Sequence, residues 1–232
     1  MADILNIKLK RDDLHTKLGG GIPTSSILLV EGGDGAGKSI IAQRFTYGLL
    51  KNNHSVSYIS SELSLMEFVS QMKSLDYNVR DRILSKQLLF ISVFPYLGNA
   101  NFSERFMDRL LVTKPIFENE VIIFDTLSFL IIQDDLSIAH VFDFIKIIKK
   151  ITNLGKTLIF CVDPSHLNDR VLSIIRGIAD GYLNLEIKSV LGSIMRVATI
   201  KRYKRPLSSV TPQISFKVEP GIGISIELAS LS

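Results

Sequence analysis

The sequence predicts an α/β fold with a mostly parallel central sheet flanked by helices and a C-terminal antiparallel β extension. Short apolar runs of strand length alternate with amphipathic stretches, which is typical of a series of βαβ units. The last third of the chain alternates strictly between apolar and polar residues, as half-buried antiparallel strands do. A glycine-rich stretch, GGDGAGKS, joins the first apolar run to the first amphipathic one.

Length and composition favour a single domain. With 232 residues and 46% hydrophobic content, the chain can bury a sizeable core. We expect the domain to span residues 1–232, with the β extension at about 193–232, because no internal repeat or low-complexity linker divides the sequence. The net charge of +4 permits an anionic partner without requiring one.

Cysteine usage and hydropathy exclude several classes of protein. The single cysteine, Cys161, excludes an internal disulfide framework, and the four histidines lack the spacing of metal ligands. The longest apolar segment, VIIFDTLSFLII, is shorter than the ~20 residues of a membrane span and contains Asp125. The N-terminal stretch MADILNIKLKRDD has no apolar run of signal-peptide length. We therefore expect a cytoplasmic protein without a transmembrane segment.

The elements of the parallel sheet follow from the apolar runs. Strands buried on both faces are predicted at residues 25–31, 55–61, 88–94, 121–125 and 157–163. Such strands pair in parallel, and the connections between them should be right-handed. Helical spacing between the runs predicts two amphipathic helices, one with Ile41, Phe45, Gly48 and Leu49 on its apolar face and one with Ile138, Val141, Phe142, Ile145 and Ile148.

The stretch ISFKVEPGIGISIEL predicts an antiparallel hairpin with one buried face. Its apolar residues alternate with others on both sides of the turn signal Pro220-Gly221: Ile214, Phe216 and Val218 before it, and Ile222, Ile224, Ile226 and Leu228 after it.

The glycine-rich stretch satisfies the phosphate-loop pattern G-x-x-x-x-G-K-[ST]. A buried strand precedes it and an amphipathic helix follows, which is the arrangement in which loop amides and a helix N-terminus surround a phosphate. Lys38 would contact the β and γ phosphates, and the Ser39 hydroxyl would coordinate Mg²⁺. The alternative is a glycine-rich turn with a solvated lysine. We expect an ATP site formed by Gly33, Asp34, Gly35, Ala36, Gly37, Lys38, Ser39 and Ile40.

Asp125 ends the apolar run VIIFD, where phosphate-loop proteins place a second carboxylate that holds Mg²⁺. An aspartate at the end of a strand is otherwise often a helix cap or a turn former. Because the phosphate loop is present, we predict that Ser39 and Asp125 bind Mg²⁺.

Hydrolysis of the nucleotide needs a residue that orients water. Many phosphate-loop enzymes place a glutamate directly after the metal-binding aspartate, but Thr126 stands there in this sequence. Glu62 follows the run SVSYISS, and parallel strands bring their C-terminal ends to the same edge of the sheet. We therefore predict Glu62 as the candidate base, against the alternative that it caps a helix starting near Ser64. Asp163 is a weaker candidate that could equally start the turn at Pro164.

Several segments together resemble a known family. HTKLGGGIPTSSILLVEGGDGAGKS, followed by SVSYISSEL, resembles the KaiC-like branch of the RecA superfamily, in which an L-x-G-G-G-I-P segment precedes the phosphate loop. VIIFDTLS and IADGYLNLE are also similar to segments of that branch, so the resemblance covers nearly the whole chain. Within the branch, the segments RDDLHTKLGGGIP and GDGAGKSIIAQRFTYGLL are most similar to the accessory ATP-binding proteins of the archaeal flagellum (archaellum) motor.

The resemblance implies a RecA-like fold and properties that spacing does not indicate. Proteins of the branch form six-membered rings with the nucleotide near subunit interfaces, and the flagellar subgroup docks onto the motor ATPase and a membrane platform protein. That places the subgroup at the cytoplasmic face of the membrane. The pattern of the branch has two adjacent glutamates after the second strand, but here Leu63 follows Glu62. Asp34 and Ala36 also depart from the usual loop residues, so we expect weak or slow hydrolysis.

A basic run, residues 201–205, lies near the end of the strand-like stretch IMRVATI. By resemblance, Arg202 and Lys204 match a basic pair that reaches the γ phosphate held by the neighbouring subunit, although the register could shift by one residue. The alternatives are a solvated charged strand end and a contact with anionic lipid or nucleic acid. Arg176 is expected to be a surface helix residue, with an approach to the nucleotide as the alternative.

These features favour an ATP-binding accessory protein of the archaeal flagellum motor, whose nucleotide state regulates ring assembly and interaction with the motor ATPase. An active ATPase is one alternative. A RecA-like ATPase of DNA recombination or repair is another, although no helix-hairpin-helix or other nucleic-acid module is recognisable and nucleic acid is not an expected partner. A clock-type autokinase is disfavoured because the sequence has one ATPase unit.

Overall fold

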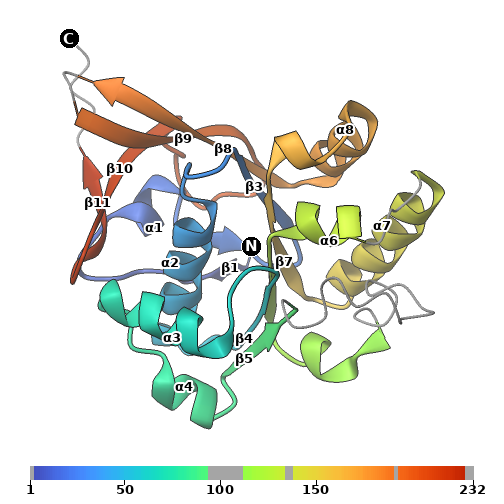
Figure 1. Ribbon diagram of the computed structural model, residues 1–232, viewed down its shortest axis with the longest axis horizontal. Helices are drawn as coiled ribbons and strands as arrows, with labels where there is room; N and C mark the ends of the chain where they lie inside the picture. Colours follow the sequence, from blue (N-terminus) through green and yellow to red (C-terminus); the bar gives the residue numbers. More distant parts are fainter. Residues whose placement is uncertain (1–2, 94–111, 134–137, 191–192, 228–232) are drawn as a thin grey trace.

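A computed structural model describes residues 3–93, 112–133, 138–190 and 193–227. Within these residues, nine strands form one sheet in the order β11-β10-β9-β8-β3-β7-β6-β4-β5 (Figure 1). The parallel part contains β3 (Ile27–Gly32), β4 (Val56–Ser60), β5 (Leu88–Ser92), β6 (Val121–Asp125), β7 (Thr157–Val162) and β8 (Gly181–Val190). The antiparallel part contains β9 (Ser193–Tyr203), β10 (Gln213–Glu219) and β11 (Gly223–Glu227).

The parallel strands confirm the five predicted runs. Every residue of β3, β4, β6 and β7 is buried, as expected for strands covered on both faces. The run predicted at 88–94 forms a strand only to Ser92, and Phe94 lies outside the described residues. The prediction that this strand is buried on both faces is wrong: β5 is at the edge of the sheet, and its residues after Leu88 are only partly buried.

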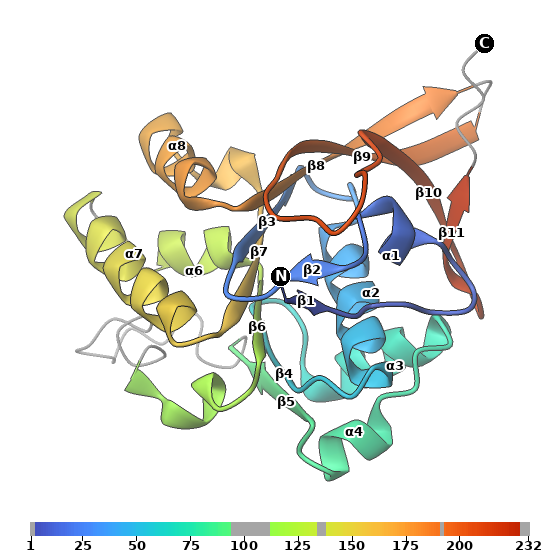
Figure 2. The same cartoon turned by 180° about the vertical axis from the view of Figure 1, so that it is seen from behind.

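Helices cover both faces of this part of the sheet, as Figures 1 and 2 show. One face carries α2 (Lys38–Lys51), α3 (Leu65–Ser74) and α4 (Arg80–Leu84), and the other carries α6 (Leu127–Gln133), α7 (Ile138–Asn153) and α8 (Asp169–Ile178). Two apolar clusters result, one on each face. Phe45 of α2 is fully buried in the first, and Ile148 of α7 in the second, as the helical spacing predicts. The prediction for Phe142 of α7 is wrong, because this side chain is 49% exposed.

Short elements complete the described chain. They are β1 (Ile4–Leu5), α1 (Leu14–Lys17), β2 (Ile22–Pro23) and two 3-10 helices, η2 (Lys114–Phe117) and η3 (Pro164–His166). In the described residues no helix has both the length and the apolar character needed to cross a membrane. The same residues contain no group of three or more His, Cys, Asp or Glu side chains arranged to hold a metal ion.

The C-terminal hairpin forms largely as predicted. Phe216 pairs with Ile226 and Val218 with Ile224, and the side chains of Phe216 and Ile224 are buried. The prediction for Ile222 is wrong: the residue is 47% exposed. Its amide donates to the Glu219 carbonyl, so Ile222 belongs to the turn and the strand resumes only afterwards. Leu228 lies outside the described residues.

The three glycines of the L-x-G-G-G-I-P segment join the N-terminal residues to the β extension. Gly21 has φ +126°, and a Cβ there would lie 2.3 Å from the Leu5 carbonyl oxygen, so only glycine fits. Its own carbonyl accepts a hydrogen bond of 2.6 Å from the Tyr203 hydroxyl of β9. The Gly19 carbonyl accepts from the amides of Leu207 and Ser208. This motif therefore has a structural role in this chain.

A buried ion pair fixes the N-terminal segment to α2. The guanidinium of Arg44 donates to both carboxylate oxygens of Asp12 at 2.7 Å, and both side chains are 0% exposed. Arg44 also donates to the Ile7 carbonyl at 3.0 Å. Buried charges are stable only when they are paired in this way.

Replacing Arg44 with methionine should lower the free energy of unfolding by about 3–5 kcal/mol, because the Asp12 carboxylate would stay buried without its partner. Urea unfolding followed by circular dichroism measures the change. Lys146→Met, which breaks the exposed Lys146–Asp143 pair, is the control and should have little effect. An equal loss of unfolding free energy in the two variants would contradict the stabilising role assigned to the buried Arg44–Asp12 pair.

Candidate functional site

A cavity of about 400 Å³ lies where the parallel strands end. Parallel strands bring their C-terminal ends to one edge, so residues that are distant in the sequence meet there. The lining residues come from the phosphate loop, from the segments that follow β4, β6 and β7, and from β9: Asp34, Gly35, Gly37, Lys38, Ser39, Ile40, Glu62, Thr126, Asp163, His166 and Arg196. The sequence predicted most of this set.

The backbone of the phosphate loop adopts positive φ angles at two of its glycines. Gly35 and Gly37 adopt φ of +69° and +98°, a region that other residues rarely enter. A Cβ at Gly37 would lie 2.9 Å from Cδ of Arg196. Gly37 is also the N-cap of α2, and no described side chain caps this helix end. The amides at the start of α2 therefore suit an anionic ligand, because a helix N-terminus carries partial positive charge.

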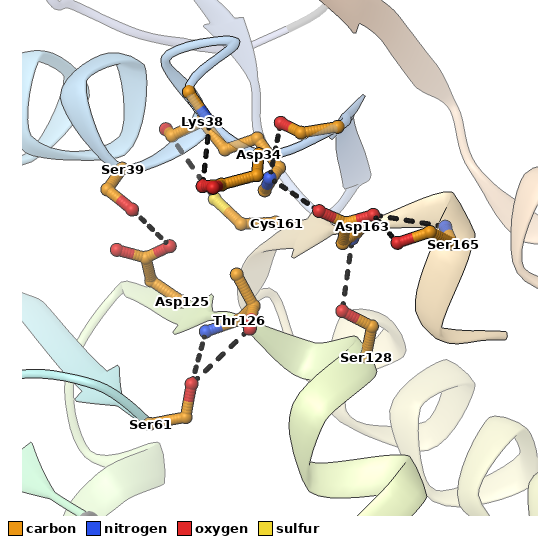
Figure 3. Close-up of polar contacts among 12 residues, drawn as sticks. Asp34, Lys38, Ser39, Ser61, Asp125, Thr126, Ser128, Cys161, Asp163 and Ser165 are labelled. Carbon is orange, nitrogen blue, oxygen red and sulfur yellow. Dashed lines mark hydrogen bonds and ion pairs between the residues drawn. The ribbon is translucent and has the colours of Figure 1, made fainter.

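Lys38 is held between the loop and β7 (Figure 3). Its ammonium donates to the Gly33 carbonyl at 2.8 Å and to Asp163 Oδ2 at 3.2 Å, and the residue is 8% exposed. Burial acts to raise the pKa of Asp163, but hydrogen bonds from Ser165 and Lys38 outweigh it and lower that pKa. Asp163 also caps η3 by accepting from the Ser165 amide at 3.0 Å, so its predicted role in starting the turn at Pro164 is confirmed.

Ser39 and Asp125 meet as predicted for a metal site (Figure 3). The Ser39 hydroxyl donates to Asp125 Oδ1 at 3.0 Å, and Asp125 is 4% exposed. Burial raises the pKa of Asp125, and hydrogen bonds from Tyr58 and Ser39 oppose that rise. A hydroxyl and a carboxylate are hard oxygen donors of the kind that Mg²⁺ prefers, so the residues present fit this ion.

Glu62 lies at the cavity and does not cap α3. Ser64 is the N-cap: its hydroxyl accepts from the Glu67 amide, and Glu67 Oε2 accepts from the Ser64 amide at 2.8 Å. The alternative assignment of Glu62 as a helix cap is therefore wrong. The Glu62 side chain is solvent-exposed, but local desolvation of its carboxyl and the nearby charge of Asp125 raise its pKa.

Arg196 was missed by the sequence analysis. It lies on β9, where it pairs with Ile187 of β8, and its Nε donates to the Gly35 carbonyl at 3.1 Å. The sequence held no signal for this contact, because it depends on the register of β9 against β8 and of β8 against β3. His166 was also missed. It lies in η3 after β7, and its approach to the cavity depends on the path of the chain after the strand, which the sequence pattern does not give.

Arg202 and Lys204 lie far from the phosphate loop of their own chain. Tyr203 between them pairs with Gly181 at the start of β8, whereas the loop end of β3, Gly32, pairs with Leu185. Four residues of strand separate these positions, which is roughly 13 Å. Arg202 donates at 2.9 Å to the carbonyls of residues 176 and 179, and the Lys204 ammonium lies 3.1 Å from Asp180 Oδ1.

Arg176 lies on helix α8 with a partly exposed side chain, as expected, but it also has a structural role. Its guanidinium forms a two-point ion pair with Glu31, whose side chain is only 3% exposed. Glu31 directly precedes Gly32, so this pair anchors the strand that leads into the phosphate loop. Arg176 remains 40% exposed, but it serves as the counterion of a buried carboxylate.

Comparison with known proteins gives consistent results. A family model described as "ATPase: KaiC" matches residues 10–229. The chain is 39% identical over 232 residues to the archaeal flagellar ATP-binding protein FlaH of Methanocaldococcus jannaschii, covering 100% of this chain and 99% of that protein. It is 36% identical over 226 residues to FlaH of Methanococcus voltae, covering 97% and 98%. The crystal structure of the flagellar accessory protein FlaH from Methanocaldococcus jannaschii matches with a TM-score of 0.92 at 39% identity, covering 98% and 100%.

Replacing Gly37 with alanine should abolish saturable ATP binding, because the new Cβ would displace Arg196 and strain the loop. Gly155→Ala is the matched control: Gly155 has φ +89° but no atom within 4 Å of a new Cβ. Both variants should lose a similar stability of about 1 kcal/mol from backbone strain. Filter binding of labelled ATP and thermal unfolding separate the two effects. Normal ATP binding by Gly37→Ala would contradict the proposed loop function.

Proposed function

The chain belongs to the KaiC family of ATPases and, within it, to the archaeal FlaH group, and from this premise we propose that it is an ATP-binding accessory protein of the archaeal flagellum motor. The observation that carries the proposal is that Lys38 and Ser39 line one cavity beside the N-terminus of α2, where the Ser39 hydroxyl donates to the buried carboxylate of Asp125. The names of the relatives that match over the whole chain support the flagellar role more than the alternative role in DNA recombination or repair.

We propose that residues 33–40 hold the phosphates of ATP. The loop amides and the start of α2 would donate to phosphate oxygens, and the Lys38 ammonium would neutralise part of their charge. Ser39 and Asp125 would hold Mg²⁺, which supplies further positive charge beside the β and γ phosphates when it is bound. Arg196 adds a second cationic side chain at the cavity, and it is anchored to the loop through the Gly35 carbonyl.

Hydrolysis is proposed to be slow and to depend on Glu62. Thr126 follows the metal-binding aspartate, and Asp163 is engaged with Lys38 and Ser165. Glu62 lines the cavity without a described hydrogen bond to its carboxylate, so it can accept one from water. Its side chain is exposed and no described hydrogen bond fixes the carboxylate, which favours binding over fast turnover.

Assembly is the proposed output of nucleotide binding. Because Arg202 and Lys204 lie remote from the loop of their own chain, a contact with phosphate would have to reach a neighbouring subunit. A nucleotide bridging two subunits stabilises the assembly that binds it, so ATP would favour a ring, proposed to be hexameric. The ring would bind the motor ATPase and a platform protein at the cytoplasmic face of the membrane.

Lys38→Ala should remove ATP-dependent assembly, because its ammonium is a main counter-charge for the phosphates. Size-exclusion chromatography with light scattering, with and without Mg-ATP and the motor ATPase, measures the assembled mass. Lys51→Ala, at the other end of α2, is the control and should assemble as the wild type does.

Arg202→Glu, compared with Lys201→Glu, tests the contact between subunits in the same experiment. If the assembled mass of every protein is the same with and without ATP, the proposal that nucleotide binding controls assembly is wrong.

Glu62→Gln should leave ATP affinity nearly intact and reduce phosphate release to background, because the amide cannot serve as a base. Glu67→Gln is the control, since glutamine keeps the capping box. Wild-type turnover should fall as the pH is lowered through the pKa of Glu62, and the fall should begin at a higher pH than for an ordinary glutamate because that pKa is raised. Phosphate release by Glu62→Gln at the wild-type rate would remove Glu62 from the mechanism.

A further inference from the structure

A buried tyrosine reaches the carboxylate that is proposed to hold magnesium. Tyr58 is 0% exposed, and its hydroxyl lies 2.5 Å from Asp125 Oδ2. The register between β4 and β6 explains the contact: Ser60 pairs with Asp125, and Tyr58 lies two residues earlier on the same face of the sheet. The long phenol side chain spans this offset along the strands.

The tyrosine ring is held firmly by aromatic neighbours. Its centroid lies 4.8 Å from that of Phe68 on α3 and 6.0 Å from that of Phe90 on β5. The ring therefore has little freedom, and its hydroxyl is presented to Asp125 from a fixed position. A buried hydroxyl is costly unless it is hydrogen-bonded, and here a carboxylate serves as its acceptor.

The two oxygens of Asp125 have different donors. Oδ1 accepts from the Ser39 hydroxyl at the start of α2, and Oδ2 accepts from the Tyr58 hydroxyl within the sheet core. Two donors from different elements, one on each oxygen, restrict rotation of the carboxylate about its terminal bond. Oδ1 is thereby kept on the side of the phosphate loop.

We propose that Tyr58 is a positioning residue that orients the Asp125 carboxylate for Mg²⁺. The inference rests on the proposed binding of Mg-ATP and extends it to a residue that does not line the cavity. Residues that hydrogen-bond to a metal ligand and so orient it commonly change the metal affinity by about 10- to 100-fold when they are removed. A tyrosine that only filled space would affect stability without any dependence on magnesium.

The test is the Mg²⁺ concentration needed for half-maximal retention of labelled ATP by the full chain. Tyr58→Phe should raise this concentration about tenfold or more, while ATP binding measured in EDTA stays at the wild-type level. Tyr77→Phe is the matched control, because Tyr77 is equally buried and its hydroxyl accepts a hydrogen bond from the Ile224 amide, outside the cavity lining. It should keep the wild-type magnesium requirement.

A double variant shows whether Tyr58 acts through Asp125. In an Asp125→Asn background, Tyr58→Phe should cause little further change, because the carboxylate that it orients is gone. An unchanged magnesium requirement in Tyr58→Phe, or an equal loss of ATP binding with and without magnesium, would overturn the inference. A wild-type chain that retains no ATP at any magnesium concentration would instead overturn the proposed function, and this inference with it. ATP binding in EDTA also reports whether each variant is folded.

Discussion

Burial of the Asp125 carboxylate constrains the whole edge of the sheet. A charged group that is 4% exposed is tolerated only where hydrogen-bond donors or cations surround it. Ser39 from the start of α2 and Tyr58 from β4 supply those donors, so a helix start and two strands must meet within hydrogen-bond distance. The parallel sheet makes this possible because it brings successive strand ends to the same edge. The phosphate loop owes its position to the same geometry.

Two further ion pairs fix the loop at both of its ends. Glu31 precedes the loop and is held by Arg176 from α8, while Lys38, near the end of the loop, is paired with Asp163 directly after β7. Removing Arg176 would leave the Glu31 carboxylate buried without a partner, and removing either member of the Lys38–Asp163 pair would leave the other one buried, so each loss would be costly. The loop is thus anchored to the elements around it before any ligand binds. Preorganised donors of this kind favour tight binding, since little ordering remains to be done.

Local pattern predicted those parts of the fold and site that depend on consecutive residues. The strand run VIIFD located Asp125, and the loop motif located Lys38 and Ser39. Contacts that depend on the register between distant strands were not predictable, which is why Tyr58 and Arg196 were missed. Alternation alone also placed the turn residue Ile222 on the buried face. A period of two gives the face of a residue within a strand but does not give the position at which the strand begins.

The same geometry distinguishes a site for binding from a site for rapid turnover. Lys38 and Asp125 are buried and Ser39 is half-buried, and each is held by partners from another element. Glu62 is exposed at the edge of the cavity. Precise placement of a base contributes much of its catalytic effect, so an exposed carboxylate without a described hydrogen bond is expected to activate water poorly. Under the proposed function, such a site would bind ATP without rapid turnover, as a nucleotide-controlled assembly requires.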